Sequence, residues 1–286
     1  MEFDKILVVG LDGLDHQKIQ EYRCENLMQD SFGKLELDGI QLSTPMLWSS
    51  FMTGEKPESH GIDKMLAAKG EKARRFDNTA LKLFNLLGMS GLHVRKTLIY
   101  YLYSSSMVPM TRDDLEAEPL FEEVADAEVL TMPGYTDYPY IAGKMNVGPV
   151  LSRDNPPASR ERVFRDMRAE FEHRRKRLFE HMSDHTFLMQ HFHYPDWFQH
   201  LFFNGSRDKE MYTEMNELAG DILEEAGDDT LVVFLSDHGL EGGGHRDEAF
   251  YSANAQIGED VTITNLMDRC LHQLSYAKSE EVDVEV

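Results

Sequence analysis

Three short apolar runs stand out along the chain, and each ends abruptly in polar residues. They cover Leu231–Leu235, Lys5–Leu11 and Thr186–Phe192. Short runs that are apolar on both faces are typical of strands buried in a parallel sheet. The pattern therefore predicts three buried strands whose carboxyl ends carry polar side chains.

Longer segments between these runs place apolar residues at helical spacing. The clearest is Ser159–Met182. Its predicted inward residues are Val163, Met167, Phe171 and Leu178. Further helices are predicted over His16–Met28, Lys209–Glu225 and Thr264–Tyr276, and a short helix over Leu120–Ala127 leads into a strand over Glu128–Met132. Strands alternating with helices indicate an α/β fold.

Other segments define the organisation of the chain. Lys34–Leu42 alternates around Asp38–Gly39, which predicts a hairpin. No internal repeat or low-complexity linker is present, so we interpret residues 1–286 as a single domain. Residues 66–160 lack a ligand cluster and are rich in charged and Gly/Pro/Tyr loops, which predicts a cap or lid-like elaboration beside the site.

The segment Ser43–Ile62 reads STPMLWSSFMTGEKPESHGI. Thr44 followed by Pro45 indicates an N-cap and a first helical residue. The apolar face of this helix is Leu47, Trp48, Phe51 and Met52, and Gly54 would stop it. Thr44 has an ordinary interpretation as a cap. Its oxygen would also sit at the positive end of the helix, where a metal beside it could make it a nucleophile.

Candidate ligands follow each predicted strand. They are Asp12 after the first run, Asp196 and His200 after Thr186–Phe192, and Asp237, His238 and His245 after Leu231–Leu235. Taken singly, these are turn aspartates and surface histidines. However, ligand sites in open α/β sheets lie beyond the carboxyl ends of the strands. If Asp196 begins a helix, its i,i+4 spacing also puts His200 on the same face. The joint placement predicts a metal site.

Composition narrows the classes of partner. The chain has 51 Asp+Glu against 29 Lys+Arg, a formal charge of -22, which argues against binding to duplex nucleic acid or an anionic membrane. It fits an acidic, halophile-like surface. Cys24 and Cys270 form no disulfide framework or metal-type spacing. With no basic leader region and no run of transmembrane length, the expectation is a cytoplasmic protein.

Taken together, the motifs resemble the alkaline phosphatase superfamily, and most closely its type I phosphodiesterase/nucleotide pyrophosphatase branch. The matching sequence motifs are LVVGLDGLD, STPMLWSSFMTGEKPESHGI, PDWFQH, LSDHG and GGGH, spanning residues 6–245. The resemblance implies an alkaline phosphatase-like three-layer α/β/α sandwich with a mostly parallel central sheet. It also implies two divalent metal ions, Zn²⁺ first and Mn²⁺ as the alternative.

Carried over by position, the resemblance divides the ligands into two sets. Asp196, His200 and His245 would hold one metal, and Asp12, Asp237, His238 and the Thr44 hydroxyl the other. Two metals can clamp an in-line displacement at phosphorus, with Thr44 forming a covalent phosphothreonine. The asparagine that usually follows the HGI word is missing here. Lys64 is the candidate to replace it as a substrate-binding charge.

Several functions remain open at this point. The first is a phosphodiesterase or nucleotide pyrophosphatase acting on a small phosphate ester or nucleotide. The alternatives are a phosphomonoesterase, a phosphotransferase or phosphomutase, and a noncatalytic phosphate-ligand binding protein. The mutase branch uses serine as its nucleophile, so Thr44 counts against it, and no CxPxR-like sulfatase word is present. His60 and His193 are interpreted as loop residues near the site that are not ligands.

Overall fold

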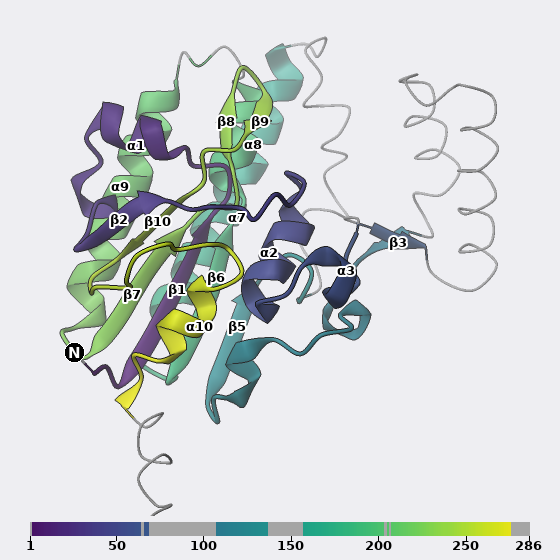
Figure 1. The fold of residues 1–286 in the computed structure, drawn as a ribbon. Helices are drawn as coiled ribbons and strands as arrows, with labels where there is room; N and C mark the ends of the chain where they lie inside the picture. The colour runs from purple at the N-terminus through teal and green to yellow at the C-terminus, as the bar shows by residue number, and fades with distance from the viewer. Residues whose placement is uncertain are drawn as a thin grey trace, which may run out of the picture.

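Among the described residues, six strands form the central sheet, in the order β2-β10-β7-β1-β6-β5 (Figure 1). The computed structural model describes residues 2–63, 66–68, 107–136, 157–202, 205 and 207–275. The strands are β1 (Lys5–Leu11), β2 (Ser31–Lys34), β5 (Ala127–Thr131), β6 (Phe187–Phe192), β7 (Thr230–Leu235) and β10 (Phe250–Ala253). β1 runs parallel to β6 and β7, β5 runs parallel to β6, and β10 is antiparallel to both of its neighbours. The predicted mostly parallel sheet is confirmed.

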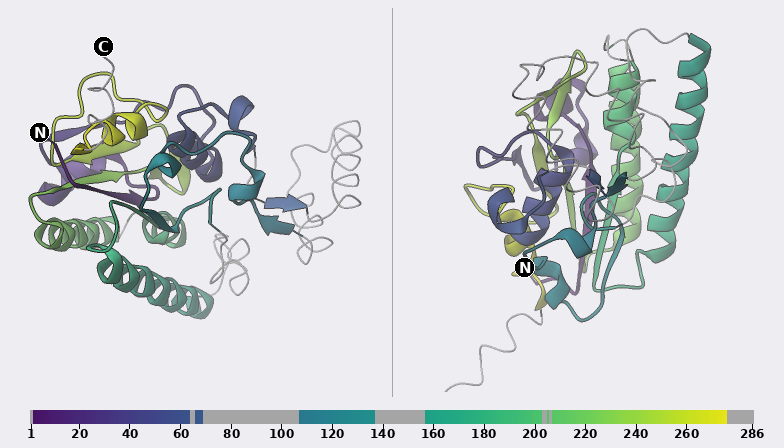
Figure 2. Two further views of the ribbon diagram at one scale, coloured as in Figure 1. Left: turned by 90° about the horizontal axis from the view of Figure 1, so that it is seen from below. Right: turned by 90° about the vertical axis from the view of Figure 1, so that its right-hand side faces the viewer.

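Helices cover both faces of this sheet. In the described part of the chain the helices are α1 (His16–Tyr22), α2 (Thr44–Thr53), α3 (Pro57–His60), α7 (Pro157–His181), α8 (Tyr194–Leu201), α9 (Asp208–Ala226) and α10 (Leu266–Leu271). Short 3-10 turns are η1 (Glu25–Leu27), η2 (Arg112–Asp114) and η3 (Leu120–Glu123). Two small antiparallel pairs join β3 (Leu66–Ala68) to β4 (Met107–Pro109) and β8 (Gly239–Glu241) to β9 (Gly244–Arg246). Figure 2 shows α7 and α9 on one face and α2 and α10 on the other. The sandwich therefore has three layers.

The side chains of β1 contribute to two hydrophobic cores, one on each face of the sheet. Leu7, Val9 and Leu11 belong to the core beneath α7 and α9. Ile6 and Val8 belong to the core beneath α2 and α10. Alternate side chains of a strand point to opposite faces, so a wholly apolar strand is required when helices cover both faces.

The predicted hairpin over residues 34–42 is wrong. β2 ends at Lys34 and pairs with β10, and Glu36 bridges Thr262. Asp38 and Gly39 do form a turn with positive φ, but the chain then enters α2 without returning along β2. The alternation arose because Leu35 and Leu37 are buried in the second core from an extended edge segment.

Several helix boundaries also differ from the predictions. The helix expected over residues 16–28 stops at Tyr22, because Arg23 takes a left-handed conformation with φ 56°. The closing helix is only Leu266–Leu271. In α2 the N-cap is Ser43, one residue earlier than expected, while Gly54 ends the helix as predicted, with φ 71°. The long predicted helices correspond to α7 and α9.

The range predicted to form a cap, residues 66–160, lies largely outside the described residues. β3, β4, η2 and η3 fall in this range, and so does β5, which is an edge strand of the central sheet. Residues 69–106 and 137–156 lie outside the described part of the chain, so the cap stays a prediction. No helix among the described residues is both long enough and apolar enough to cross a bilayer.

Gly10 allows α2 to pack closely against β1. A Cβ at Gly10 would lie 2.7 Å from the Trp48 ring and 3.1 Å from the His191 ring. We expect Gly10→Ala to lower the free energy of unfolding by about 1–3 kcal/mol, because overpacking forces side chains out of their rotamers. The measurement is urea-induced unfolding. Gly244→Ala is the matched control, since its nearest contact would be an ordinary 3.6 Å. Equal effects of the two substitutions would contradict the close-packing argument.

Candidate metal centre

The predicted ligands converge at the carboxyl ends of β1, β6 and β7. Asp12 follows β1, and Asp237 and His238 follow β7. All three are buried, with exposed fractions of 1%, 0% and 0%. Asp196 and His200 lie on α8, which follows β6, and His245 lies on β9. The three strands are adjacent in the sheet, so side chains from distant parts of the chain meet at one edge.

The first ligand group consists of Asp196, His200 and His245. His200 Nε2 lies 3.2 Å from Asp196 Oδ1 and 3.3 Å from His245 Nε2. His245 Nε2 lies 3.8 Å from the same carboxylate oxygen. The i,i+4 arrangement predicted for Asp196 and His200 is confirmed, because both lie on α8.

The second ligand group adjoins the first. His238 Nε2 lies 3.4 Å from Asp12 Oδ1 and 3.5 Å from Asp237 Oδ2. Asp196 joins the groups, since one ligand atom each from Asp12, Asp196 and His238 all lie within 4.8 Å of one another. The structure thus brings together the six aspartate and histidine ligands that the sequence suggested.

These separations fit shared coordination of metal ions. Ligand atoms about 2.0–2.1 Å from a tetrahedral zinc ion are about 3.3–3.4 Å apart. Five measured separations within the two groups run from 3.2 to 3.8 Å. The groups therefore match the spacing of ligands around an ion.

Buried atoms without hydrogen bonds support the same conclusion. Among the described residues they include Asp12 Oδ1, His238 Nε2 and both carboxylate oxygens of Asp237. Buried polar atoms are normally satisfied, so a set of unsatisfied ones facing one another requires an explanation. His238 Nδ1 lies 3.1 Å from the Gly239 carbonyl, which can only accept. Nδ1 therefore donates, and Nε2 presents its lone pair to the carboxylates.

The electrostatics of the site also favour a cation. Burial, together with the charges of Asp237 and Asp196, raises the pKa of the Asp12 carboxyl well above its ordinary value. Burial acts to raise the pKa of Asp196 as well, but the hydrogen bond and charge of His200 outweigh it and lower that pKa to about 2. Divalent cations bound among clustered carboxylates are often the largest local charges in a site. The donor set therefore fits divalent metal ions.

Two further histidines contact Asp12: His191, for which no role was predicted, and His193, which was predicted to be a loop residue near the site and not a ligand. His193 Nδ1 lies 2.7 Å and His191 Nε2 3.4 Å from Asp12 Oδ2. Burial lowers the pKa of His193 to about 3. A signal was present, because the buried strand β6 contains two polar residues, Gln190 and His191. The His191 carbonyl accepts from Arg174 Nη1 at 2.7 Å, and Arg174 pairs with the buried Glu170 at 2.6 Å.

Thr44 is the predicted site residue that the contacts do not join to the ligands. It begins α2 and is 7% exposed, and its side chain makes no hydrogen bond to another described residue. One turn later, the Trp48 ring lies 4.9 Å from the His191 ring, so α2 packs against the site. Lys64 lies outside the described residues.

His60 has a structural role. It ends α3, it is buried, and its Nδ1 accepts from the Ile62 amide at 3.1 Å. Nε2 must then carry the proton and donate to Ser50 Oγ at 3.0 Å. This arrangement links α2 to α3 and leaves no basic nitrogen that could activate Ser50.

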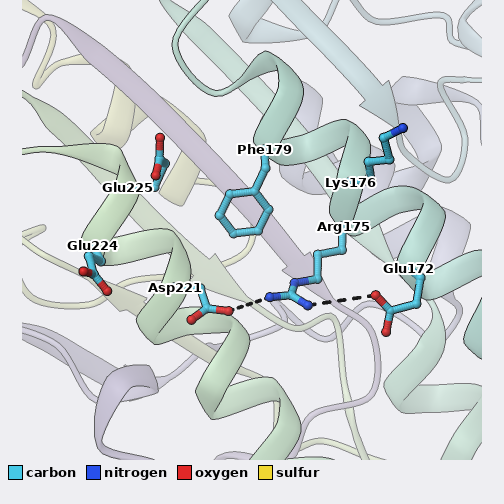
Figure 3. A pocket seen from close by; sticks show the side chains of 7 residues that line it. All are labelled: Glu172, Arg175, Lys176, Phe179, Asp221, Glu224 and Glu225. Atoms are coloured by element: carbon cyan, nitrogen blue, oxygen red, sulfur yellow. Dashed lines mark hydrogen bonds and ion pairs between the residues drawn. The ribbon is translucent and has the colours of Figure 1, made fainter.

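A separate hollow lies on the outer helices α7 and α9 (Figure 3). It is lined by Glu172, Arg175, Lys176, Phe179, Asp221, Glu224 and Glu225. Arg175 Nη2 is 2.7 Å from Asp221 Oδ2, so the Arg175 guanidinium in this hollow already forms an ion pair. None of the predicted ligands lines this hollow.

Comparison with protein families gives one match over most of the chain. The profile of the type I phosphodiesterase / nucleotide pyrophosphatase family matches residues 7–254. No curated protein matches the chain.

The chain is also similar to solved structures. The PH0037 protein from Pyrococcus horikoshii is 13% identical, with a TM-score of 0.50 over 94% of this chain and 98% of that one. Murine ectonucleotide pyrophosphatase / phosphodiesterase 5, as an inactive threonine-to-alanine form in complex with AMP, is 12% identical, with a TM-score of 0.49. That alignment covers 82% of this chain and 57% of the murine chain, so this chain spans just over half of the murine protein. The Pyrococcus structure supports the α/β/α fold.

Proposed function

The chain belongs to the type I phosphodiesterase / nucleotide pyrophosphatase family, and from this we propose that it cleaves phosphodiesters or nucleotide pyrophosphates with Thr44 as nucleophile at a two-metal site. Membership makes it a phosphoester hydrolase. The observation that carries the finer proposal is the pair of adjoining ligand groups, whose separations of 3.2–3.8 Å match those of metal ligands. A single group would hold one ion, whereas two adjoining groups suit a site that acts on both the attacking and the leaving oxygen.

The proposed ligand sets follow these groups. Asp196, His200 and His245 would hold one ion. Asp12, Asp237 and His238 would hold the other, together with the Thr44 hydroxyl. Three of the six protein ligands other than Thr44 are imidazoles, which favours zinc over magnesium or calcium, and manganese is the alternative. When bound, such ions act as Lewis acids and lower the pKa of a neighbouring hydroxyl group.

The proposed reaction has two displacements. Thr44 Oγ1 gives its proton to solvent and attacks phosphorus, so that the bond from Oγ1 to phosphorus forms while the bond to the leaving alcohol or phosphate breaks and the leaving oxygen takes a proton from solvent. Water then displaces Oγ1 and releases the phosphate product. The first turn of α2 supports this role, because amide groups at a helix N-terminus stabilise an anion. The ten-residue helix begins at Thr44 itself.

The test compares two chromogenic substrates. We expect the zinc-loaded protein to hydrolyse an aryl phosphodiester faster than the matching monoester, and metal depletion to abolish both activities. Initial rates should be measured with zinc and with manganese at matched free-ion concentrations. Preference for the monoester would assign the same site to a phosphomonoesterase. Silence on both esters, despite bound zinc, would reject hydrolysis in favour of phosphotransfer or ligand binding.

A further inference from the structure

The two carboxylate oxygens of Asp12 have different surroundings. Oδ1 lies 3.4 Å from His238 Nε2 and has no hydrogen-bond partner among the described residues. Oδ2 lies 2.7 Å from His193 Nδ1. One oxygen therefore faces the second ligand group, while the other faces a buried imidazole.

The distance to His193 distinguishes two possible roles for this imidazole. Asp12, His191 and His193 could form a third metal-binding group, since their ligand atoms lie within 4.8 Å of one another. Two ligands of a tetrahedral zinc ion would be about 3.3–3.4 Å apart. The 2.7 Å between His193 Nδ1 and Asp12 Oδ2 is shorter and falls in the range of a charge-assisted hydrogen bond. The geometry favours a hydrogen bond over a shared ion.

We propose that His193 is a positioning residue, whose Nδ1–H holds Asp12 Oδ2 so that Oδ1 is the oxygen presented to a divalent cation. This inference rests on the metal-binding part of the proposed function and is independent of the substrate. A hydrogen bond to the outer oxygen fixes the rotation of the carboxylate, which would otherwise be free to bind with either oxygen. The pair joins β1 to the start of α8.

The surroundings of His193 hold its ring in place. The ring stacks on Trp197 at 4.9 Å between centroids with an interplanar angle of 9°. It also meets the edge of His191 at 4.2 Å. His193 is the N-cap of α8, but its side chain makes no capping hydrogen bond to the helix. The Nδ1 atom of this side chain instead contacts Asp12 Oδ2.

The choice of replacement gives a sharp test. The amide nitrogen of asparagine occupies nearly the same place as Nδ1 of histidine, whereas that of glutamine lies farther along the side chain, near the place of Nε2. We expect His193→Asn to keep the zinc affinity of the Asp12 site within about threefold, and His193→Gln and His193→Ala to weaken it roughly 10- to 100-fold. The measurement is competition for Zn²⁺ with a chromophoric chelator.

Each metal site can be measured alone by combining the His193 variants with a substitution that weakens the other site. In the His245→Ala protein the Asp12 site should be the stronger remaining one, and its zinc affinity should be higher in the His193→Asn variant than in the His193→Gln and His193→Ala variants. In Asp237→Asn the Asp196 site should remain, and the His193 substitutions should leave its affinity unchanged. Equal losses in both backgrounds would overturn the inference, because they would show that His193 merely supports α8. Equal affinities for the asparagine and glutamine variants would overturn it as well.

The number of zinc ions bound per chain tests the alternative that His193 is a ligand of a third metal ion. Binding of three zinc ions per native chain, reduced to two in every His193 variant, would show a third metal site and overturn the positioning role. Hydrolysis is measured separately on the native protein. Normal zinc binding with the expected His193 pattern, but without ester hydrolysis, would reject the proposed reaction and leave this inference standing.

Discussion

Replacing Thr44 with alanine is expected to lower the rate of phosphodiester hydrolysis by roughly 10⁴- to 10⁶-fold, as removal of other enzymatic nucleophiles does. Zinc binding should be largely preserved, because the aspartate and histidine ligands lie outside α2: after β1, after β7, on α8 and on β9. The measurements are the turnover of an aryl phosphodiester and the zinc content of the same protein. Together they separate loss of the nucleophile from loss of the metal.

Two neighbouring substitutions serve as controls. Thr44→Ser keeps a hydroxyl at the start of α2 and should retain much of the activity. Ser43→Ala alters the N-cap residue, whose side chain makes no capping bond, and should leave turnover nearly unchanged. If Thr44→Ala hydrolysed the diester at the native rate, Thr44 would not be the nucleophile, and attack by water would have to be considered instead.

Asp237→Asn is expected to have opposite effects on stability with and without metal. Both carboxylate oxygens of Asp237 are buried and lack hydrogen bonds among the described residues. In the metal-depleted protein, the substitution removes a buried negative charge beside Asp12 and should raise the free energy of unfolding by about 1–3 kcal/mol. In the presence of zinc, the native protein gains stability from bound ligand and the variant gains less.

The measurement is urea-induced unfolding of both proteins, with chelator and with zinc. The expected result is a crossing of the order of stability between the two conditions. Asp247→Asn is the matched control, because the Asp247 side chain is 61% exposed and belongs to neither ligand group. A variant that is less stable than the native protein under both conditions would show that Asp237 contributes to folding by some contact other than metal binding.

The strands β1, β6 and β7 and the convergence of the residues that follow them were predictable because their signals are local. A run such as Leu231–Leu235 must be buried on both faces, and residues that follow such runs must meet at one edge of the sheet. The spacing of Asp196 and His200 likewise predicts one helix face. These inferences need no knowledge of which strands are neighbours.

Features set by distant contacts were not predictable in the same way. The alternation over residues 34–42 indicated an extended segment, but it could not reveal that β2 pairs with β10 rather than with the next segment. The contact of His193 with Asp12 joins residues 181 positions apart, so no local pattern indicates it. The position of Thr44 relative to the ligands depends on how α2 packs, and it stays a prediction.

The central place of β1 in the sheet has a consequence for biosynthesis. β1 is flanked by β6 and β7, which begin at Phe187 and Thr230, so β1 has to await two strands that are made much later. Contacts of such long sequence separation form slowly, since the entropy of closing a long loop is lost before pairing compensates for it. A nascent chain that contains Asp12 but has not yet reached Asp237 and His238 lacks the other members of the second ligand group. The second ligand group is therefore complete only once His238 has been made, and the first only once His245 has been made.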